Sequence, residues 1–250
     1  EEQGTPLKKN TIANNFQLWG DYAWPKDGDE WDGQAIGCNK PYEGWKRSLV
    51  EALIRPYINH SSTVLEIGSG HGRWSKEIAP LCGNLILVDL SPSCIEYCRS
   101  LFKDRSNVSF VVNQGNDLTG IPDESIDFVW SYDVFVHIGS AEIEAYFGEI
   151  RRVLRPKGTA VIHHAGRRHL LLPLRFLRES PTGSRIYNFI TINVFAEELG
   201  WRSDVSRALV RRLARRQGLI VEAQVNRWGE NAELGVPRFR DAVSILQRPG

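Results

Sequence analysis

The stretch V-L-E-I-G-S-G-H-G-R-W-S, residues 64–75, combines an apolar run with three glycines on alternate positions. A glycine-rich turn after an apolar run lets the backbone approach a bound ligand closely, because glycine carries no side chain. The turn begins like the nicotinamide-binding fingerprint G-x-G-x-x-G, but Arg73 stands where its last glycine belongs. A phosphate-binding P-loop would need a glycine followed by lysine and a hydroxyl residue, and this stretch lacks them.

An acidic residue, Asp89, closes the next apolar run, Leu85–Val88. A carboxylate at the end of the second strand of such a unit typically accepts hydrogen bonds from ribose hydroxyls. Together the two features predict a site that binds a nucleoside through its ribose, without a clear cradle for phosphates.

Candidate acid–base groups follow the apolar run Ile126–Ser131. If residues 131–137 turn helically, Asp133 and His137 share one face at four-residue spacing, and the aspartate can orient the imidazole as a general base. A hydrogen bond from His137 to nearby backbone is the structural alternative. His163 and His164 end a later apolar run, and strand alternation sends one of them toward the pocket. His164 is preferred because it is nearer the strand end.

The same side chains raise the question of a metal ion. Asp133, His137 and a strand-end histidine form a candidate cation site, but two or three histidines suit zinc or iron better than magnesium. The sequence shows no dense acidic cluster and no cysteine pair at metal-ligand spacing. We therefore expect no metal, with a divalent cation as the alternative. The four cysteines are expected to be buried, reduced thiols of a cytoplasmic protein.

The elements that must position these groups alternate between strands and helices. The pattern predicts an α/β fold with a doubly wound, mostly parallel seven-stranded sheet, an antiparallel last strand and helices on both faces. Ser91 and Pro92 predict a helix start, and residues 140–154 and 205–217 predict amphipathic helices. The expected strands are residues 64–67, 85–88, 108–112, 126–131, 159–163, 219–225 and 242–247.

At 250 residues the chain is expected to form one domain with two attachments. We expect an aromatic-rich helical cap in residues 1–59 and a Rossmann-like cofactor-binding core in residues 60–164. Residues 165–203 are expected to form a lid over the acceptor, which is the second molecule bound beside the cofactor. Residues 204–250 are expected to supply the closing helix and strands of the core. The lid suits a small or glycosylated acceptor, although a partner or dimer surface is the alternative. Rings in the cap can stack on an acceptor or pin the cap to the sheet: Trp19, Tyr22, Trp24, Trp31, Tyr42 and Trp45.

Five motifs in order carry a family resemblance over residues 60–165: V-L-E-I-G-S-G-H-G, L-I-L-V-D, Q-G-N-D-L, I-D-F-V-W-S-Y-D and I-R-R-V-L-R-P-K-G-T-A. The chain resembles the class I S-adenosylmethionine-dependent methyltransferases. The resemblance implies that Glu66 and the turn Gly68, Ser69, Gly70 and Gly72 face the methionine end of the cofactor. It implies that Asp89 takes the ribose hydroxyls and that Leu90 packs beside the adenine. It further implies an adenine contact from Asp117, with Asn116 and Leu118 beside it, and a carbonyl from Ser131 for the methionine ammonium. A plain turn role is the alternative for Asp117.

The resemblance implies methyl transfer to a small-molecule acceptor, with a hydroxyl of a sugar or natural product as the leading hypothesis. N-methylation of an amino sugar or amine, and a non-catalytic cofactor-binding protein, are the alternatives. A net charge of +1 gives no argument for nucleic acid or a membrane surface. The sequence has no apolar stretch long enough to span a membrane, and its first ten residues lack the apolar core of a signal peptide. A cytoplasmic protein is expected, and a homodimer is left open.

Overall fold

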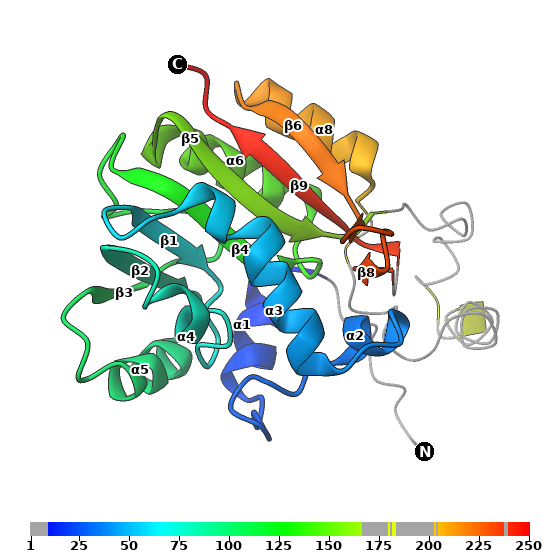
Figure 1. The fold of residues 1–250 in the computed structure, drawn as a ribbon, viewed down its shortest axis with the longest axis horizontal. Coiled ribbons are helices and arrows are strands. Elements are labelled where there is room, and N and C mark those ends of the chain that lie inside the picture. Colours follow the sequence, from blue (N-terminus) through cyan, green and yellow to red (C-terminus); the bar gives the residue numbers. More distant parts are fainter. Residues whose placement is uncertain (1–9, 167–179, 181, 184–202, 204, 238–239) are drawn as a thin grey trace.

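A seven-stranded sheet with the order β3-β2-β1-β4-β5-β9-β6 organises the protein (Figure 1). The computed structural model describes residues 10–166, 180, 182–183, 203, 205–237 and 240–250. The strands are β1 (Thr63–Ile67), β2 (Asn84–Asp89), β3 (Val108–Val112), β4 (Ile126–Phe135), β5 (Leu154–His164), β6 (Ile220–Val225) and β9 (Ala242–Gln247).

The sheet is mixed, with parallel and antiparallel strands, as the sequence predicts. Strands β1 to β5 pair in parallel, and β9 pairs antiparallel to both β5 and β6. The predicted antiparallel pairing of the last two strands is therefore confirmed. Strand β9 inserts between β5 and β6, so that β6 forms the edge of the sheet. A small hairpin of β7 (Arg227–Trp228) and β8 (Leu234–Gly235), which the sequence analysis did not find, lies outside this sheet.

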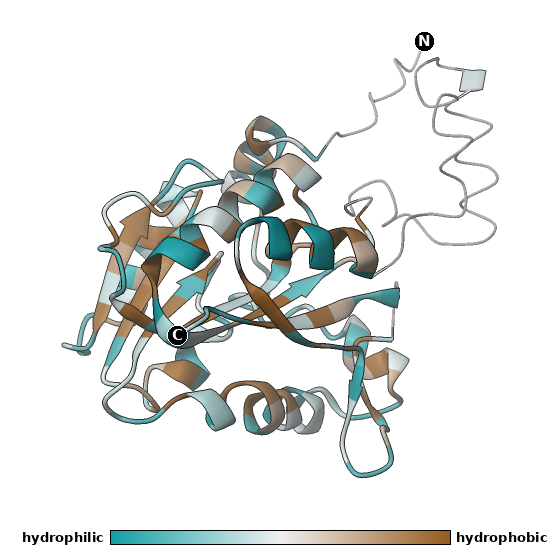
Figure 2. Ribbon diagram, turned by 90° about the horizontal axis from the view of Figure 1, so that it is seen from above, coloured by the Kyte–Doolittle hydropathy of each residue, from teal (hydrophilic) through white to brown (hydrophobic). Residues whose placement is uncertain are grey.

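Helices lie on both sides of the sheet (Figure 2). They are α1 (Ile12–Gly20), α2 (Gly33–Gly37), α3 (Tyr42–Leu53), the 3-10 turn η1 (Arg55–Tyr57), α4 (Ser75–Ile78), α5 (Pro92–Leu101), α6 (Ser140–Val153) and α8 (Arg207–Arg216). The predicted start of α5 is confirmed, because the Ser91 hydroxyl accepts a hydrogen bond from the N–H of Cys94 and Pro92 follows it. Helix α6 begins at Ser140, as predicted, and Gly139 is its N-cap residue.

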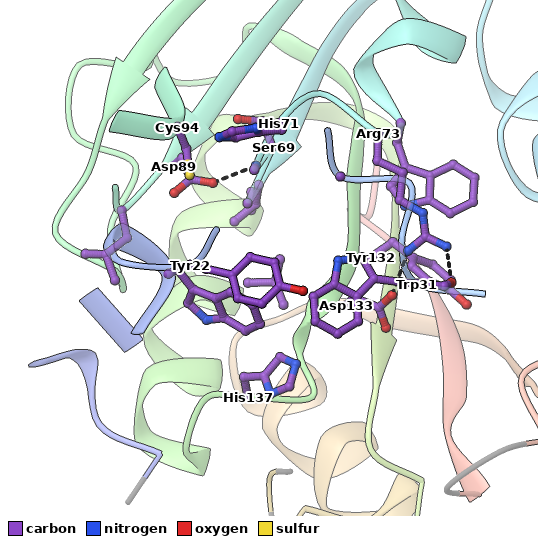
Figure 3. Close-up of a pocket in the computed structure, with 18 of the residues that line it drawn as sticks. Tyr22, Trp31, Ser69, His71, Arg73, Asp89, Cys94, Tyr132, Asp133 and His137 are labelled. Atoms are coloured by element: carbon purple, nitrogen blue, oxygen red, sulfur yellow. Dashed lines mark hydrogen bonds and ion pairs between the residues drawn. The ribbon is translucent and has the colours of Figure 1, made fainter. Parts of the chain in front are cut away.

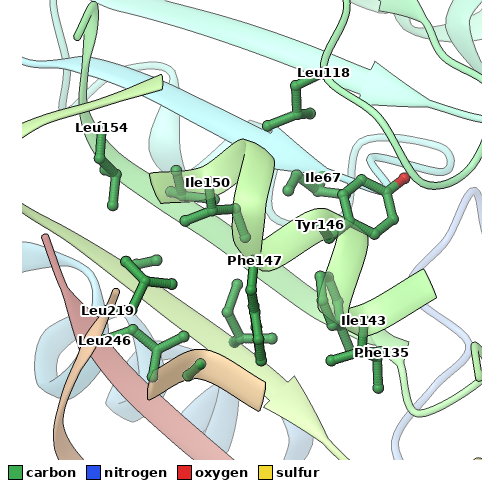
Figure 4. Packing of buried hydrophobic residues seen from close by; sticks show 14 of the residues in the cluster. Ile67, Leu118, Phe135, Ile143, Tyr146, Phe147, Ile150, Leu154, Leu219 and Leu246 are labelled. Atoms are coloured by element: carbon green, nitrogen blue, oxygen red, sulfur yellow. The ribbon is translucent and has the colours of Figure 1, made fainter. Parts of the chain in front are cut away.

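One face of the sheet packs against α6 and α8. Ile143, Phe147 and Ile150 of α6 are fully buried, as their spacing predicts, and they belong to one cluster with Leu219 and Leu246 (Figure 4). The opposite face packs against the N-terminal cap. There, Trp45 and Leu49 of α3 join Trp74 and Trp130 in a second cluster. The cap is thus part of the core that supports the site.

Strand β4 departs from the prediction in a way that matters for the site. It continues to Phe135, four residues beyond the predicted end at Ser131. Residues 131–135 therefore lie in a strand and not in a helix, and the expected helical face shared by Asp133 and His137 is wrong. The strand is irregular there, because its pairing with β5 shifts register between Ser131 and Phe135 and the φ of Asp133 is +61°.

The predicted lid falls almost entirely outside the described residues. Its arginines (Arg167, Arg168, Arg175, Arg178 and Arg185), the apolar stretch 170–174 and Phe189 all lie there. Within the described part, Cys82, Cys94 and Cys98 are buried and no cysteine forms a disulfide. None of the described helices has the length and apolar character needed to cross a bilayer. Location in the cell and oligomeric state stay predictions.

Candidate active site

A cavity of about 670 Å³ lies between the glycine turn after β1 and the N-terminal cap. Its walls come from the turn, from the ends of β2 and β4, and from the cap (Figure 3). This is the carboxyl edge of the parallel strands, where open α/β sheets bind their ligands. The residues that line it and enter the argument are Trp19, Tyr22, Trp24, Glu30, Trp31, Asp32, Gly68, Ser69, Gly70, His71, Arg73, Asp89, Leu90, Asn113, Gly115, Asp133, Val134 and His137.

The three glycines of the turn have different reasons to be glycine. All have positive φ, and a Cβ on Gly68 would collide with Cγ2 of Val134. A Cβ on Gly70 would lie 2.8 Å from the ring of Trp24. Gly72, which does not line the cavity, faces Leu101 of α5 instead. The first two therefore permit the close approach of backbone at the cavity, whereas the third permits packing of a helix.

Asp89 is held in place by two backbone groups. Its Oδ2 accepts a hydrogen bond from the N–H of Gly70, and its Oδ1 accepts one from the N–H of Ser91, both at 2.8 Å. Burial raises the pKa of this carboxyl group, and these backbone bonds oppose the rise. A fixed carboxylate beside a turn without room for side chains fits a ribose and the close backbone approach that S-adenosylmethionine requires. Asp89 and Leu90 would hold the nucleoside there.

Glu66 and Ser131 lie beneath the turn and do not line the cavity. Glu66 is buried and accepts a hydrogen bond from the Ser75 hydroxyl at 2.6 Å. Burial, and then the nearby Asp89 carboxylate, raise the pKa of Glu66 to about 8. The Ser131 hydroxyl donates to the carbonyl of Ile67 at 2.9 Å. Both side chains support the turn from below.

The loop after β3 lines the cavity, but with residues other than the predicted Asn116, Asp117 and Leu118. The Asp117 carboxylate accepts hydrogen bonds from the N–H groups of Gln114 and Thr119, which is the turn role. Leu118 is fully buried in the core, and neither it nor Asn116 or Asp117 lines the cavity. Asn113 and Gly115 line it instead. The glycine at position 115, whose φ is +90°, is the sequence signal that could have found this part of the loop.

Arg73, which the sequence analysis treated only as a break in the fingerprint, is a buried member of the site. Its guanidinium donates to Oδ2 of Asp133 at 2.9 Å and to the carbonyl of Trp31 at 2.8 Å (Figure 3). It also donates to the hydroxyl of Tyr42 at 2.9 Å. It also lies 4.9 Å from the ring centre of Trp74. Arg73 therefore joins the cap, the turn and β4.

The candidate histidines separate into three environments. His137 lines the cavity, and its ring lies edge-on to Trp19 at 5.2 Å. His163 is buried directly behind Asp133, with Nδ1 3.2 Å from Oδ1 of that residue. His164 is buried on the other face of β5, where its ring nitrogens contact the Ala165 carbonyl and the Ser244 hydroxyl, both at 2.7 Å. Burial lowers the pKa of His164 to about 4. The preference for His164 as the pocket residue is therefore wrong, and His163 is the one that faces the site.

Aromatic rings of the cap form a further part of the cavity wall. Trp19, Tyr22 and Trp31 lie within 6.1 Å of one another, centre to centre. Trp24 stacks on His71, and His71 stacks on Tyr97 of α5. Trp45, in contrast, is fully buried and donates to the carbonyl of Gly235, so it pins the cap to the core. The expected role of holding the cap on the core is thus seen for Trp45, whereas stacking on an acceptor stays a prediction for the rings that line the cavity. Across the described residues, no group of three or more His, Cys, Asp or Glu is arranged to hold a metal ion.

The sheet order defines a Rossmann-like domain, and the glycine turn and the fixed carboxylate form a candidate nucleoside site at its carboxyl edge. Residues 64–158 match the family model described as a methyltransferase domain. The sequence is 30% identical to phosphoethanolamine N-methyltransferase 1 from Triticum aestivum over 125 residues, 48% of this chain and 24% of that protein. It is 26% identical to nodulation protein S from Rhizobium tropici over 163 residues, 65% of this chain and 63% of that protein.

A solved structure with the same fold is that of a putative sarcosine dimethylglycine methyltransferase from Galdieria sulphuraria, with a TM-score of 0.59 and 16% identity over 96% of this chain and 99% of that one. The chain carries a class I S-adenosylmethionine-dependent methyltransferase domain, as the sequence motifs predict. It spans less than two thirds of both curated relatives.

Proposed function

We propose that the protein transfers the methyl group of S-adenosylmethionine to a small-molecule acceptor in this cavity. The supporting observation is the division of one cavity into a nucleoside side, with the turn and Asp89, and an aromatic side, with Trp19, Tyr22 and Trp31. When bound, the cofactor supplies an activated methyl group. The protein then has to align the acceptor and exclude water, which a largely aromatic wall favours.

The charge of the wall supports a neutral acceptor over an anionic one. Among the described lining residues, the carboxylates are Glu30, Asp32, Asp89 and Asp133, whereas Arg73 is already paired with Asp133. A phosphate or carboxylate on the acceptor would therefore meet repulsion at short range. Aromatic rings beside carboxylates suit a ring that carries hydroxyl groups. Our first candidate is therefore a hydroxyl of a sugar or natural product.

His137 is the side chain we assign to the proton of that hydroxyl. An alcohol is a poor nucleophile and needs a general base within hydrogen-bond reach. His137 lines the cavity on the side away from Ser69, His71 and Asp89 in Figure 3. Asp133 does not orient it, because that carboxylate faces Arg73 and His163.

Methylation of an amine nitrogen is the second candidate. The excess of carboxylates in the wall attracts a cationic group. One relative over the shared core is named for N-methylation of phosphoethanolamine. An ammonium group must lose a proton before it can attack, and His137 would accept that proton too.

A labelling experiment separates the candidates. The purified protein is incubated with methyl-labelled S-adenosylmethionine and a panel of neutral glycosides, phenols, amines and phosphorylated compounds. We expect label in a neutral hydroxyl compound. Label in amines alone would support the second candidate. Label only in phosphorylated compounds, in protein or in RNA would overturn the proposal.

A further inference from the structure

A buried row of polar side chains runs from the cavity wall to the far side of β5. Arg73 donates to Asp133, Asp133 contacts His163, and Nε2 of His163 lies 3.2 Å from Oδ2 of Asp241. The same Oδ2 accepts a hydrogen bond from the side chain of Gln34 in α2, at 3.0 Å. His163 and Asp241 have no exposed surface, whereas the Asp133 side chain is 32% exposed. The row therefore reaches solvent-accessible space at Asp133, which lines the cavity.

The hydrogen bond of the Asp133 backbone assigns the proton of His163. The N–H of Asp133 donates to Nδ1 of His163 at 3.2 Å, so this nitrogen acts as the acceptor. Oδ1 of Asp133 also lies 3.2 Å from Nδ1. The ring proton then belongs on Nε2, the nitrogen beside the Asp241 carboxylate. A carboxylate behind a histidine commonly fixes the tautomer in this way.

The backbone of Asp133 has an unusual conformation that the hydrogen bond to His163 helps to stabilise. Its φ is +61°, in the left-handed region that residues other than glycine seldom occupy. Such a conformation persists where the surroundings enforce it, and it is common at functional sites. The His163 bond holds the backbone, and the Arg73 bond holds the carboxylate. Together they present a fixed anionic group at the cavity surface.

We propose that Asp133 is an acceptor-binding residue and that His163 and Asp241 are positioning residues that act through it. The carboxylate accepts a hydrogen bond from a hydroxyl or ammonium donor of the acceptor, next to the atom that is methylated. This inference rests on the proposed function, because it requires the acceptor to bind in this cavity. It gives Asp133 a role separate from His137, which takes the proton.

The first test needs no acceptor. Nitrogen NMR of the histidine side chains in the wild-type protein reports the tautomer of His163, with the signal assigned by its loss in His163→Gln. We expect a proton on Nε2 and none on Nδ1. A protonated Nδ1 would overturn the inference. A wild type that shows the expected tautomer but does not bind S-adenosylmethionine would instead defeat the proposed function, so the two failures are distinguishable.

The second test is a double-mutant cycle with a neutral glycoside that the wild type methylates. Asp133→Asn is expected to raise the KM for the glycoside about 10- to 100-fold, the range for a lost hydrogen bond to a charged group. Asp241→Asn is expected to raise it about 5-fold alone and to add nothing in the Asp133→Asn background, because coupled residues are not additive. The affinity for S-adenosylmethionine should stay within about 2-fold in each variant.

A merely structural role gives a different pattern. In that case Asp241→Asn lowers the melting temperature but leaves the glycoside KM unchanged, or its effect on KM adds to that of Asp133→Asn. Either result for KM would overturn the inference. Asp104→Asn, on an exposed turn, is the matched control and should change neither quantity. If Asp241→Asn does not fold, Gln34→Leu removes the donor that holds Asp241, and a glycoside KM unchanged in that variant would also count against the inference.

Discussion

Asp89 differs from the other carboxylates of the cavity because two backbone N–H groups already orient it. We expect Asp89→Asn to weaken binding of S-adenosylmethionine about 10- to 100-fold, because the ribose hydroxyls lose a charged acceptor and the amide cannot accept from both backbone donors. Isothermal titration calorimetry measures the change, with Asp104→Asn as the exposed control. Equal affinities of Asp89→Asn and wild type would remove the basis of the nucleoside site.

A second side chain to test singly is His137. In His137→Gln, turnover of a hydroxyl acceptor should fall by about two to four orders of magnitude, the usual contribution of a general base. Binding of S-adenosylmethionine should be retained, which calorimetry checks. His60→Gln, at an exposed turn, is the matched control. If His137→Gln turns over at the wild-type rate, another group takes the proton.

The pKa of about 8 at Glu66 makes a prediction about stability. The folded protein keeps this carboxyl group protonated while the unfolded chain ionises it near its ordinary value of 4.5. The stabilising contribution is therefore complete below about pH 4.5 and is lost as the pH rises toward 8. Glu66→Gln, which mimics the protonated form, should raise the melting temperature more at pH 8 than at pH 5. Thermal denaturation followed by circular dichroism tests this, and a gain that is equal at both pH values would contradict it.

At the scale of elements, the connection from β1 to α4 depends on the lack of a side chain at Gly68. Gly68→Ala should destabilise the fold by about 2 kcal/mol or more, because a left-handed backbone cost adds to the collision with Val134. Gly120→Ala is the control, since its φ is +88° but nothing lies within 4 Å of an added Cβ. It should lose only about 1 kcal/mol. Urea denaturation gives both values.

A second variant tests whether the collision with Val134 causes the loss of stability in Gly68→Ala. Val134→Ala in the Gly68→Ala background removes both methyl groups that the new Cβ would meet. Part of the lost stability should then return, although Val134→Ala alone is destabilising. If the double variant is less stable than the sum of the two single changes predicts, the collision is not the cause.

The elements were largely predictable because their signals are local. The order of the strands along the chain, the Ser91 cap and the buried face of α6 follow from residue type and periodicity. The contacts of the site were not, because the Arg73–Asp133 pair joins residues 60 positions apart. Asp117 shows that a local sequence signal can also be misread. A residue with a local turn partner and a residue with a ligand look alike in sequence, and the nearby backbone N–H groups occupy Asp117.

At the scale of the whole molecule, the cap and the sheet share one core. Helix α1 is tied to the loop after β4 by the bond from the Asn15 amide to the His137 carbonyl, at 2.9 Å. Helix α3 is tied to β8 by the bond from Trp45 to Gly235, at 2.8 Å. Arg73 adds bonds to Trp31 and Tyr42 of the cap. The aromatic wall therefore keeps its position only while the core is intact.

This sharing predicts that cap and sheet unfold together. Tryptophan fluorescence and far-ultraviolet circular dichroism should give coincident urea transitions, since many of the tryptophans lie in the cap whereas the sheet contributes much of the dichroism. Trp45→Ala should lower the free energy of unfolding by about 3–5 kcal/mol, the cost of emptying a fully buried aromatic site. Phe16→Ala in α1, where the side chain is 49% exposed, should change it little. A fluorescence transition that precedes the dichroism change would mean that the cap opens independently, and the acceptor wall would then form only when the cap closes.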